Sequence, residues 1–547
     1  MEHTENLTFP ALFAKTTRGY ANRPAMALVG EKPITYGELD RKIKALMAWL
    51  EKLGIIPGDK VAVLSTSIPN WGVSYYAITF MGAVVVPLLP DFHPDEIRNI
   101  LEHSEAKALF VSDGLRLKIN NLSREELPVK IRIEDFTLID NESPATAFPS
   151  EAEPLKQYNV TGNDLAAIIY TSGTTGKSKG VMLTHENICF TAKMSARVQK
   201  IDETDRFLSV LPLSHTYENT IGLIFPMTKG ACIYYLGKLP TPSVLLPALQ
   251  VIKPTVMLTV PLIIEKIFRT RIKPKFTGNI LLRLAIHIPF VRRKINVAAG
   301  KKLMETFGGE LRFFGIGGAK LNRTVEKFLI EAKFPYAIGY GLTETSPLLA
   351  GSNPQNFRLQ SAGPAIHGIE LIIHDPDKET GEGEIWARGP NVMKGYYKEP
   401  ELTEEILTAD GWLRTGDLGM FDKDGYLYIK GRLKNMIVRS GGENIFPEEI
   451  ESVINNFQHV VDSLVLEQKG KLVALVHFNY DEIREQHRQQ KEENINYVVH
   501  EIEKLCIELQ AYVNHHVNKF SQIQEVLIQP EPFEKTATLK IKRYLYK

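Results

Sequence analysis

The chain has 547 residues, a formal net charge of +1 and 44% hydrophobic residues. This length is too great for one ordinary hydrophobic core, so we expect two or more domains. The near-neutral charge argues against a general nucleic-acid-binding protein, which usually carries a basic excess. The three cysteines are far apart and form no CxxC pair, so they suggest neither a disulfide framework nor a cysteine zinc site.

The first twenty residues lack an apolar segment behind a basic start, and no run of about 18 apolar residues occurs in the chain. We therefore expect neither a secretory signal nor a spanning helix. The sequence predicts a cytoplasmic protein.

Helical and strand patterns alternate along the first third of the chain. The spacing of apolar residues predicts a helix over 36–53. Short buried strands are expected over 60–64 and 82–88. Residues 115–160 are polar and indicate irregular surface segments, and a compact apolar strand follows over 165–170. This alternation predicts α/β layers with mostly parallel sheets.

Strand and turn signals become denser after residue 360, and Gly431–Lys434 marks a boundary. A helix with proline in its first turn is expected to begin near Pro447, and short strands and a polar helical region follow. The sequence thus predicts a large N-terminal domain over 1–433, built of α/β layers with a β-rich subdomain. A small, mobile α+β domain is predicted over 434–547.

The strand at 165–170 runs into a loop of small and hydroxyl residues, Tyr170-Thr-Ser-Gly-Thr-Thr-Gly-Lys-Ser-Lys-Gly-Val181. Glycines let successive N–H groups point at one oxyanion, the hydroxyls add donors, and Lys179 adds charge. These features indicate a polyphosphate-binding loop. It is not a Walker loop, because Gly173 and Gly176 are separated by two residues where that motif needs four.

The segment Thr171–Gly180 resembles the phosphate loop of the adenylate-forming superfamily, which comprises acyl-CoA synthetases, peptide-synthetase adenylation domains and beetle luciferases. Further motifs follow in that family's order over nearly the whole chain. They are Leu211–Glu218, Gly315–Ala319, Tyr340–Ser346, Gly383–Gly389, Gly395–Tyr397, Trp412–Asp417, Gly431–Asn435 and Lys535–Arg543.

The resemblance implies a set of nucleotide-binding residues: Thr171, Ser172, Gly173, Thr174, Thr175, Gly176, Lys179, Gly317, Gly318, Ala319, Gly339, Tyr340, Gly341, Asp417 and Arg432. Asp417 accepts hydrogen bonds from ribose hydroxyls, and Arg432 offers donors to the same sugar or to phosphate. Glu344 supplies the hard oxygen that Mg²⁺ prefers when it is shared with ATP phosphates. Thr171 is expected to reach the same ion, and Thr343 to contact the α-phosphate.

Lys540 matches the family's lysine that reaches into the site during adenylation. There it stabilises the charge that develops on the carboxylate oxygen and the α-phosphate. Leu539 stands where the family usually has glycine. The ending Thr-Leu-Lys-Ile-Lys-Arg543 instead resembles the long-chain fatty acyl-CoA synthetase branch. Lys434 matches the hinge between the two domains.

The acyl and CoA path is assigned to His215, Gly222, Ser440, Gly441 and Gly442. A structural histidine is the other interpretation of His215. A tight turn before the Pro447 helix also fits the glycine-rich loop. The residues expected to line or approach the acyl pocket are Ser214, Tyr217, Asn219, Ile221, Gly222 and Phe225.

Residues 266–302 contain eleven Lys or Arg and no Asp or Glu, with apolar residues interleaved. This pattern suits an anionic membrane surface or an acidic lipid, on the inner face of a membrane. A solvated basic face that touches CoA phosphates fits it as well, so both interpretations stay open.

The sequence therefore predicts an ATP-dependent long-chain fatty acid–CoA ligase that acts through an acyl-adenylate. ATP, Mg²⁺ and coenzyme A are the expected cofactors, a fatty acid or other carboxylate is the expected substrate, and no nucleic acid is expected to bind. Two alternatives remain: a ligase that uses the same adenylation with an acyl carrier protein as acceptor, and a noncatalytic acyl- or nucleotide-binding protein.

Overall fold

The computed structural model describes residues 7–123, 125–139, 148, 156, 158–172, 178–272, 274, 288–438, 444–488, 495–536 and 540–546. The chain divides into two compact units. The large unit comprises Met1–Ile372, Trp386–Thr415 and Asp422–Tyr428; the small unit comprises Ile373–Ile385, Gly416–Phe421 and Ile429–Lys547. The domain boundary expected between residues 433 and 434 stays a prediction.

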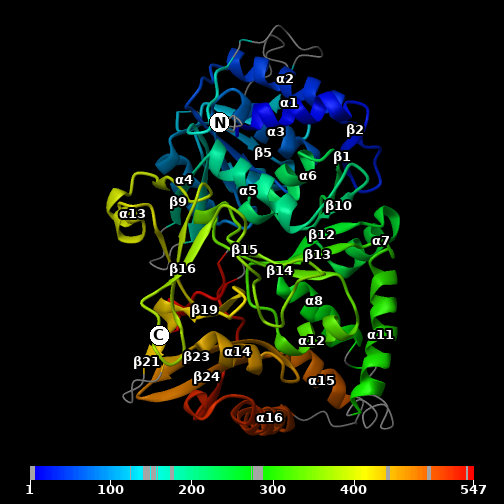
Figure 1. Cartoon of the computed structure of the whole chain (residues 1–547), viewed down its shortest axis with the longest axis vertical. Helices are drawn as coiled ribbons and strands as arrows, with labels where there is room; N and C mark the ends of the chain where they lie inside the picture. The colour runs from blue at the N-terminus through cyan, green and yellow to red at the C-terminus, as the bar shows by residue number, and fades with distance from the viewer. Residues whose placement is uncertain are drawn as a thin grey trace. The chain divides into compact units, whose positions relative to one another are not determined.

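Two eight-stranded sheets form the framework of the large unit (Figure 1). The first has the order β15 (Ala350–Gly351), β14 (Tyr336–Tyr340), β13 (Phe313–Ile316), β12 (Val256–Thr259), β10 (Arg206–Ser209), β11 (Cys232–Tyr235), β1 (Pro24–Leu28) and β2 (Ile34–Thr35). Its strands from β14 to β1 run parallel.

The second sheet has the order β18 (Gly395–Tyr396), β9 (Ser178–Thr184), β8 (Leu165–Ser172), β4 (Val84–Leu88), β3 (Lys60–Leu64), β5 (Ala106–Val111), β6 (Val129–Arg132) and β7 (Thr137–Leu138). Strands β8 to β6 run parallel, whereas β9 returns antiparallel to β8. The α/β class is confirmed, and the sheets are mixed rather than wholly parallel.

Helix α3 (Pro69–Phe80) contacts β1 of the first sheet and both β3 and β4 of the second. Its residues from Asn70 to Thr79 are all buried, as expected for a helix that is covered on every side. The largest core cluster extends from this helix to α1 (Phe9–Tyr20), α2 (Tyr36–Lys52) and α5 (His185–Val198). The core of the large unit therefore lies between its two sheets.

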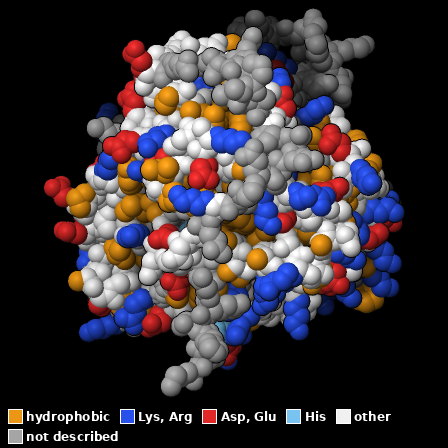
Figure 2. Space-filling model, turned by 90° about the horizontal axis from the view of Figure 1, so that it is seen from above, with side chains coloured by type: hydrophobic (Ala, Val, Ile, Leu, Met, Phe, Trp, Pro, Cys, Tyr) orange, Lys and Arg blue, Asp and Glu red, His pale blue; other side chains and the backbone are white. Residues whose placement is uncertain are grey.

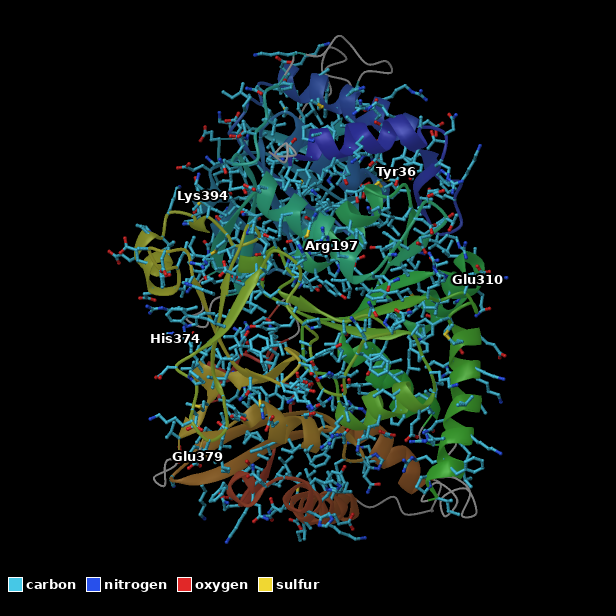
Figure 3. All side chains as sticks on the ribbon, in the orientation of Figure 1. Tyr36, Arg197, Glu310, His374, Glu379 and Lys394 are labelled. Carbon is cyan, nitrogen blue, oxygen red and sulfur yellow. The ribbon has the colours of Figure 1, made fainter. Side chains whose placement is uncertain are left out.

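Helix α2 shows how local sequence fixes one of these elements. Thr35 caps the helix: its Oγ1 accepts from Glu38 N, and the Glu38 carboxylate accepts from Thr35 N. The first helical residue, Tyr36, is fully buried and donates its hydroxyl to Ala231 O at 2.7 Å (Figure 3). The capping box begins the helix, and the tyrosine ties it to the residue before β11.

The other helices of the large unit surround the sheets. They are α4 (Pro94–Ser104), α6 (Phe225–Met227), α7 (Pro242–Ile252), α8 (Pro261–Ile267), α11 (Pro289–Thr306), α12 (Arg323–Glu331) and α13 (Pro400–Ile406), with π-helical segments η3 (Glu218–Ile224) and η4 (Phe268–Ile272). Basic and acidic side chains are interspersed on the face drawn in Figure 2, which agrees with the small net charge.

The small unit is built on a three-stranded sheet, β23 (Val460–Gln468), β24 (Lys471–Phe478) and β25 (Glu525–Ile528). Its helices are α14 (Pro447–Ile454), α15 (Tyr480–Arg488) and α16 (Ile495–His516), and the short strands β21 (Ile437–Val438) and β22 (Asn444–Ile445) precede α14. Apolar residues of α14, α16 and the sheet form one core. This arrangement matches the predicted α+β character.

A further four-stranded sheet has the order β16 (Glu370–His374), β17 (Gly383–Arg388), β19 (Leu413–Phe421) and β20 (Leu427–Arg432). The division between the two units passes through these strands. They are the strands indicated by the denser β signals after residue 360.

Most of the elements expected in the first third are present with nearly the expected limits. The exception is 115–160, which was expected to be irregular: its described part contains β6 and β7 at one edge of the second sheet. Both strands are short, and so carry little periodic signal. In the part of the chain that is described, no helix combines the length and apolarity needed to cross a bilayer.

Candidate active site

The predicted phosphate loop joins two antiparallel strands of the large unit, β8 and β9. Thr171 pairs with Lys179 and Ser172 with Ser178, so the two ends of the loop lie next to each other. The loop between them falls outside the described residues, which leaves out Gly173, Thr174, Thr175 and Gly176. Phosphate binding by these residues stays a prediction.

Lys179 and Glu344 both contact the same tyrosine. The Lys179 Nζ lies 5.1 Å from the centre of the Tyr396 ring, and the Tyr396 hydroxyl donates to Glu344 Oε1 at 2.9 Å. The main-chain oxygen of Glu344 also accepts from Met393 N at 2.9 Å. Tyr396 therefore contacts both Lys179, which borders the loop on β9, and Glu344, the predicted magnesium ligand. No role was predicted for Tyr396 from the sequence.

The turn that carries Thr343 and Glu344 is held by a buried amide. Asn391 is 0% exposed, and its Nδ2 donates to the main-chain oxygens of Thr345 and Leu348, both at 2.9 Å. Ser346 Oγ donates in return to Asn391 O at 3.0 Å. Buried hydrogen bonds of this kind are costly to break, so the turn has a fixed position.

The two glycine-rich motifs follow neighbouring parallel strands. Gly317 comes directly after β13 and Gly341 after β14, and these strands pair in parallel. A β-carbon at Gly341 would lie 1.7 Å from the Pro347 oxygen, which excludes every other residue. Gly318 has φ of +84°, a conformation that favours glycine. Ligands of α/β sheets commonly bind at such strand ends.

An apolar cavity of about 50 Å³ adjoins these strand ends. Tyr217, Ile221 and Phe225 line it, together with Gly315 and Gly339. Three of the residues expected near an acyl pocket therefore line an actual cavity. Gly339 immediately precedes Tyr340 and Gly341, so the cavity reaches the segment predicted to hold the nucleotide.

The π-helix η3, which supplies Ile221 to the cavity lining, also contains a buried acid. Glu218 is 1% exposed, and its Oε1 accepts from Ser209 Oγ at 2.5 Å. Burial raises the pKa of Glu218 to about 8. A β-carbon at Gly222 would lie 2.7 Å from the Glu218 carboxyl carbon. Gly222, predicted to lie on the acyl path, thus provides space for this carboxyl group.

His215 stands one turn before η3 and is partly buried. Its main-chain oxygen accepts from Asn219 N at 2.8 Å. Position and exposure allow either of the two interpretations made from the sequence.

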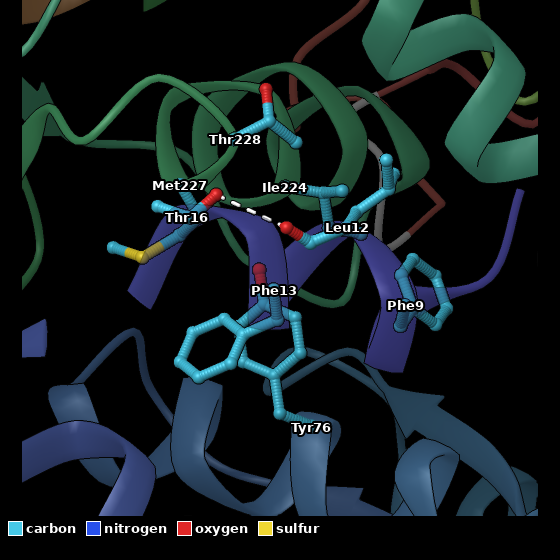
Figure 4. A pocket seen from close by; sticks show the side chains of 8 residues that line it. All are labelled: Phe9, Leu12, Phe13, Thr16, Tyr76, Ile224, Met227 and Thr228. Carbon is cyan, nitrogen blue, oxygen red and sulfur yellow. Dashed lines mark hydrogen bonds between the residues drawn. The ribbon is translucent and has the colours of Figure 1, made fainter. Parts of the chain in front are cut away.

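A second pocket in the large unit is much smaller, about 10 Å³, and lies among α1, α3 and α6 (Figure 4). Among the α1 residues that line this pocket, Thr16 has a polar side chain, and its Oγ1 already donates to Leu12 O at 3.2 Å. Room for about one water molecule makes this a packing defect rather than a substrate site.

In the small unit, Asp417 and Arg432 form an ion pair. Arg432 Nε lies 2.8 Å from Asp417 Oδ1, and the two side chains are 46% and 5% exposed, respectively. The residues lie on adjacent strands, β19 and β20. The structure joins two residues that the sequence assigned to one sugar, although their role towards ribose stays a prediction.

Lys434 lies in a short 3₁₀ segment, Leu433–Asn435, and is exposed, as is Lys540 near the end of the chain. Ser440, Gly441 and Gly442 lie outside the described residues. The hinge and thioester-loop assignments stay predictions.

The described residues contain no group of three or more His, Cys, Asp or Glu side chains arranged to hold a metal ion. Mg²⁺ is often bound by one or two carboxylates together with water and substrate phosphates. Glu344, fixed by Tyr396 and near Lys179, suits that mode of binding.

Together these features define an α/β protein with glycine-lined strand ends, a fixed carboxylate and an adjoining apolar cavity. The family model "AMP-binding enzyme" matches residues 13–397, and the chain belongs to this family. Within the adenylate-forming superfamily, its sequence relatives place it on the long-chain acyl-CoA synthetase branch.

Two sequence relatives illustrate this placement. The chain is 30% identical to the long-chain-fatty-acid–CoA ligase FadD15 of Mycobacterium bovis, over 93% of this chain and 90% of that protein. It is 28% identical to the long-chain-fatty-acid–CoA ligase heimdall of Drosophila melanogaster, over 84% of this chain and 74% of that protein.

Solved structures show the same fold. ATP-bound MatB from Rhodopseudomonas palustris matches with a TM-score of 0.77 at 24% identity, over 99% of this chain and 98% of that chain. The o-succinylbenzoate coenzyme A synthetase of Bacillus subtilis, in complex with ATP and magnesium ion, matches with a TM-score of 0.76 at 23% identity, over 97% and 98%.

Sequence reasoning missed the residues that hold the site together. Tyr396 lay inside a quoted motif, Gly395–Tyr397, but nothing in a single sequence pointed to its contact with Glu344. Asn391 precedes that motif and shows no pattern of its own. Glu218 closed the motif Leu211–Glu218, but its sequence neighbours Thr216, Tyr217, Asn219 and Thr220 carry polar groups, so no local signal indicated its burial.

Proposed function

We propose that the protein is an AMP-forming acid–thiol ligase that converts a carboxylate, ATP and coenzyme A into acyl-CoA, AMP and pyrophosphate through an acyl-adenylate. Membership of the AMP-binding enzyme family and the named activities of its relatives support the reaction type. The observation that carries the proposal is the apolar cavity whose lining includes Gly339, next to the nucleotide motif.

That arrangement suits the chemistry of activation. An acyl chain in the cavity places its carboxylate beside the glycine-rich strand ends, where the nucleotide's α-phosphate is expected. Holding two reactants in line supplies much of the catalysis in such reactions. The carboxylate attacks the α-phosphorus, pyrophosphate leaves, and the CoA thiol then attacks the acyl carbon and releases AMP.

The chain's own residues have distinct roles in this proposal. Thr343 contacts the α-phosphate, and Lys179 adds charge beside the phosphate loop. Glu344 and Thr171 hold Mg²⁺, which neutralises phosphate charge when bound. Lys540 stabilises the charge that develops during adenylation.

Asp417 and Arg432 bind the ribose, and the adenine lies against the segments Gly317–Ala319 and Gly339–Gly341. His215 and Gly222, with the loop Ser440–Gly442, belong to the acyl and CoA path, and Lys434 is the hinge of the conformational change between the two steps.

We further propose that the substrate is a long-chain fatty acid. Both relatives described above are named for this activity. The cavity lining is almost wholly apolar, with Tyr217, Ile221 and Phe225 on the helical side. Such a lining favours a hydrocarbon segment over a polar group. At about 50 Å³ the cavity holds only part of a long chain, so the proposed chain length rests on the relatives.

A pyrophosphate-release assay with carboxylates of increasing chain length tests both statements. Each acid is supplied with ATP and Mg²⁺, with free CoA, with a phosphopantetheinyl carrier protein, or with neither. We expect release to rise with chain length and acyl-CoA to form with free CoA. Product on the carrier protein alone would favour that acceptor. Failure of every tested acid to cause pyrophosphate release would favour a noncatalytic binding protein.

We also propose peripheral contact with an anionic membrane through the basic segment 266–302. In its described part, Ile288 and Phe290 are 55% and 67% exposed. Arg293 and Lys294 are exposed beside them, and Lys294 Nζ lies 4.5 Å from the Phe290 ring centre. Exposed apolar side chains next to cations are the pattern of interfacial binding.

Co-sedimentation with vesicles tests this contact. The protein should bind vesicles that contain anionic phospholipid and release as salt rises, because the attraction is screened. The double variant Phe290→Ser, Arg293→Glu should lose binding. Leu239→Ser is the matched control, because Leu239 is 76% exposed in the same unit but lies outside the basic segment. Equal binding by all three proteins would contradict the proposal.

A further inference from the structure

The end of the small unit folds back on itself around Lys540. Thr536 N donates to Lys540 O at 2.8 Å, and Lys540 N donates to Thr536 Oγ1 at 3.3 Å. Lys542 N also donates to Glu534 O at 2.9 Å. These bonds define what we call the tail hairpin, residues 533–536 and 540–546, in which Lys540 is the first described residue of the second arm.

One arm of the tail hairpin is anchored by a buried ion pair. Arg543 contacts Glu451 of α14, and the two side chains are 18% and 11% exposed. Glu451 Oε1 also accepts from Val465 N of β23 at 2.7 Å. Separating a buried pair strands a charge away from water, so this contact resists displacement.

The other arm has its own anchor. Lys535 Nζ lies 2.7 Å from Asp462 Oδ2 on β23, with side chains 28% and 21% exposed. The rings of Phe533 and Tyr546 also meet, with centroids 5.1 Å apart. Each arm is therefore tied to the body of the small unit, one contact on each side of Lys540 in sequence.

The same hairpin contains an ion pair of a different kind. Lys542 Nζ lies 3.6 Å from Glu534 Oε2, and these side chains are 33% and 67% exposed. This pair joins the two arms to each other and not to the body of the unit. Exposed pairs contribute little, so it serves as an internal comparison for the two anchors.

We propose that Glu451 and Asp462 are positioning residues for adenylation, because through Arg543 and Lys535 they fix the direction in which the tail hairpin presents Lys540. The inference rests on the proposed function and adds two residues to it. A lysine that stabilises transient charge must be placed to within about an ångström, so loosening either anchor lowers the rate of the step that uses it.

The test measures the two half-reactions separately in the full-length protein. Single-turnover adenylation is followed by pyrophosphate release, and thioester formation is followed from supplied acyl-adenylate and CoA. We expect Glu451→Gln and Asp462→Asn to lower the adenylation rate about 10- to 100-fold. KM for ATP and for the acid should stay within about twofold, as should the thioester rate.

Two further variants separate positioning from general stability. Glu534→Gln removes the exposed pair from the same hairpin and should leave both half-reactions unchanged. The exchange Asp462→Lys with Lys535→Asp reverses the second anchor at a partly exposed site, and should restore adenylation to within about threefold of wild type. Melting temperatures of all variants are measured alongside, and Asp462→Asn carries the test if Glu451→Gln does not fold.

Equal loss of both half-reactions, or unchanged adenylation in folded Asp462→Asn, would overturn the inference while leaving the proposed function intact. A wild-type protein that forms no acyl-adenylate from any carboxylate would overturn the proposed function itself.

Discussion

Each unit of the molecule buries a glutamate, but the two are held in opposite ways. Glu218 of the large unit is 1% exposed and accepts a hydrogen bond from the neutral Ser209 hydroxyl. The Glu451 side chain of the small unit is 11% exposed and pairs with Arg543. Burial raises the pKa of Glu218 to about 8. Burial also raises the pKa of Glu451, but the charge of Arg543 and the Val465 amide oppose the rise.

This difference between the two glutamates agrees with the role proposed for each unit. A neutral acid in the segment that supplies Ile221 to the cavity contributes packing and hydrogen bonding without a buried charge. A paired acid in the small unit instead holds Arg543, three residues after Lys540 in the tail hairpin. Changes in the cavity wall of the large unit should therefore alter which acid is accepted. Changes at the tail hairpin of the small unit should alter the rate of adenylation.

Replacing Lys540 tests the small-unit side of this contrast with the largest expected effect. Lys540→Ala should lower acyl-adenylate formation about 1,000-fold, because it removes charge stabilisation from the transition state. Thioester formation from supplied acyl-adenylate should stay within about threefold. Half-reaction assays measure both rates. Equal losses in the two steps would show that Lys540 does not act in adenylation.

A change in the cavity wall tests the large-unit side. Ile221→Trp narrows a cavity of about 50 Å³ and should lower kcat/KM for the longest accepted acids about 10- to 100-fold, with a smaller effect on short acids. Ile221→Ala is the matched variant and should shift the preference the other way. The measurement is kcat/KM over a series of acid lengths. A uniform fall across the series would indicate damage to the fold instead of a change in specificity.

Local sequence signals predicted some elements of the fold and missed others. Helix α2 was predicted well because its signals are local: the Thr35 cap and apolar residues at helical spacing. Strand β3 was predicted at its observed limits for the same reason. Strands β6 and β7 were missed because they have only four and two residues, too few to show a clear periodic pattern.

The site shows the same division. The motifs named the segments that hold Glu344, Asp417 and Lys540, but the supporting contacts join residues far apart in the chain. Tyr396 lies 52 residues from Glu344, and Arg543 lies 92 residues from Glu451. Pairings over such separations depend on the tertiary fold, which no local pattern in one sequence encodes.

The smallest expected effect concerns the pH dependence of the free energy of unfolding. The pKa of Glu218 is about 8 in the folded chain against 4.5 for a glutamate in water, so the folded state keeps a proton that the unfolded state loses. Wild-type stability should therefore fall as pH rises from about 4.5 to about 8 through this group. Glu218→Gln keeps a neutral side chain of similar shape and cannot ionise, so it lacks that contribution.

Melting temperatures of wild type and Glu218→Gln, measured from pH 6 to pH 8, provide the check. Across this range, the free energy of unfolding of the variant should rise relative to that of wild type by about 1–2 kcal/mol. This figure allows for relaxation and water entry around the buried acid. Glu534→Gln is the control for a surface acid, since Glu534 is exposed on the tail hairpin, and its curve should run parallel to that of wild type. Parallel curves for Glu218→Gln as well would mean that Glu218 is ionised in the folded protein, and the two buried acids would then no longer differ in charge.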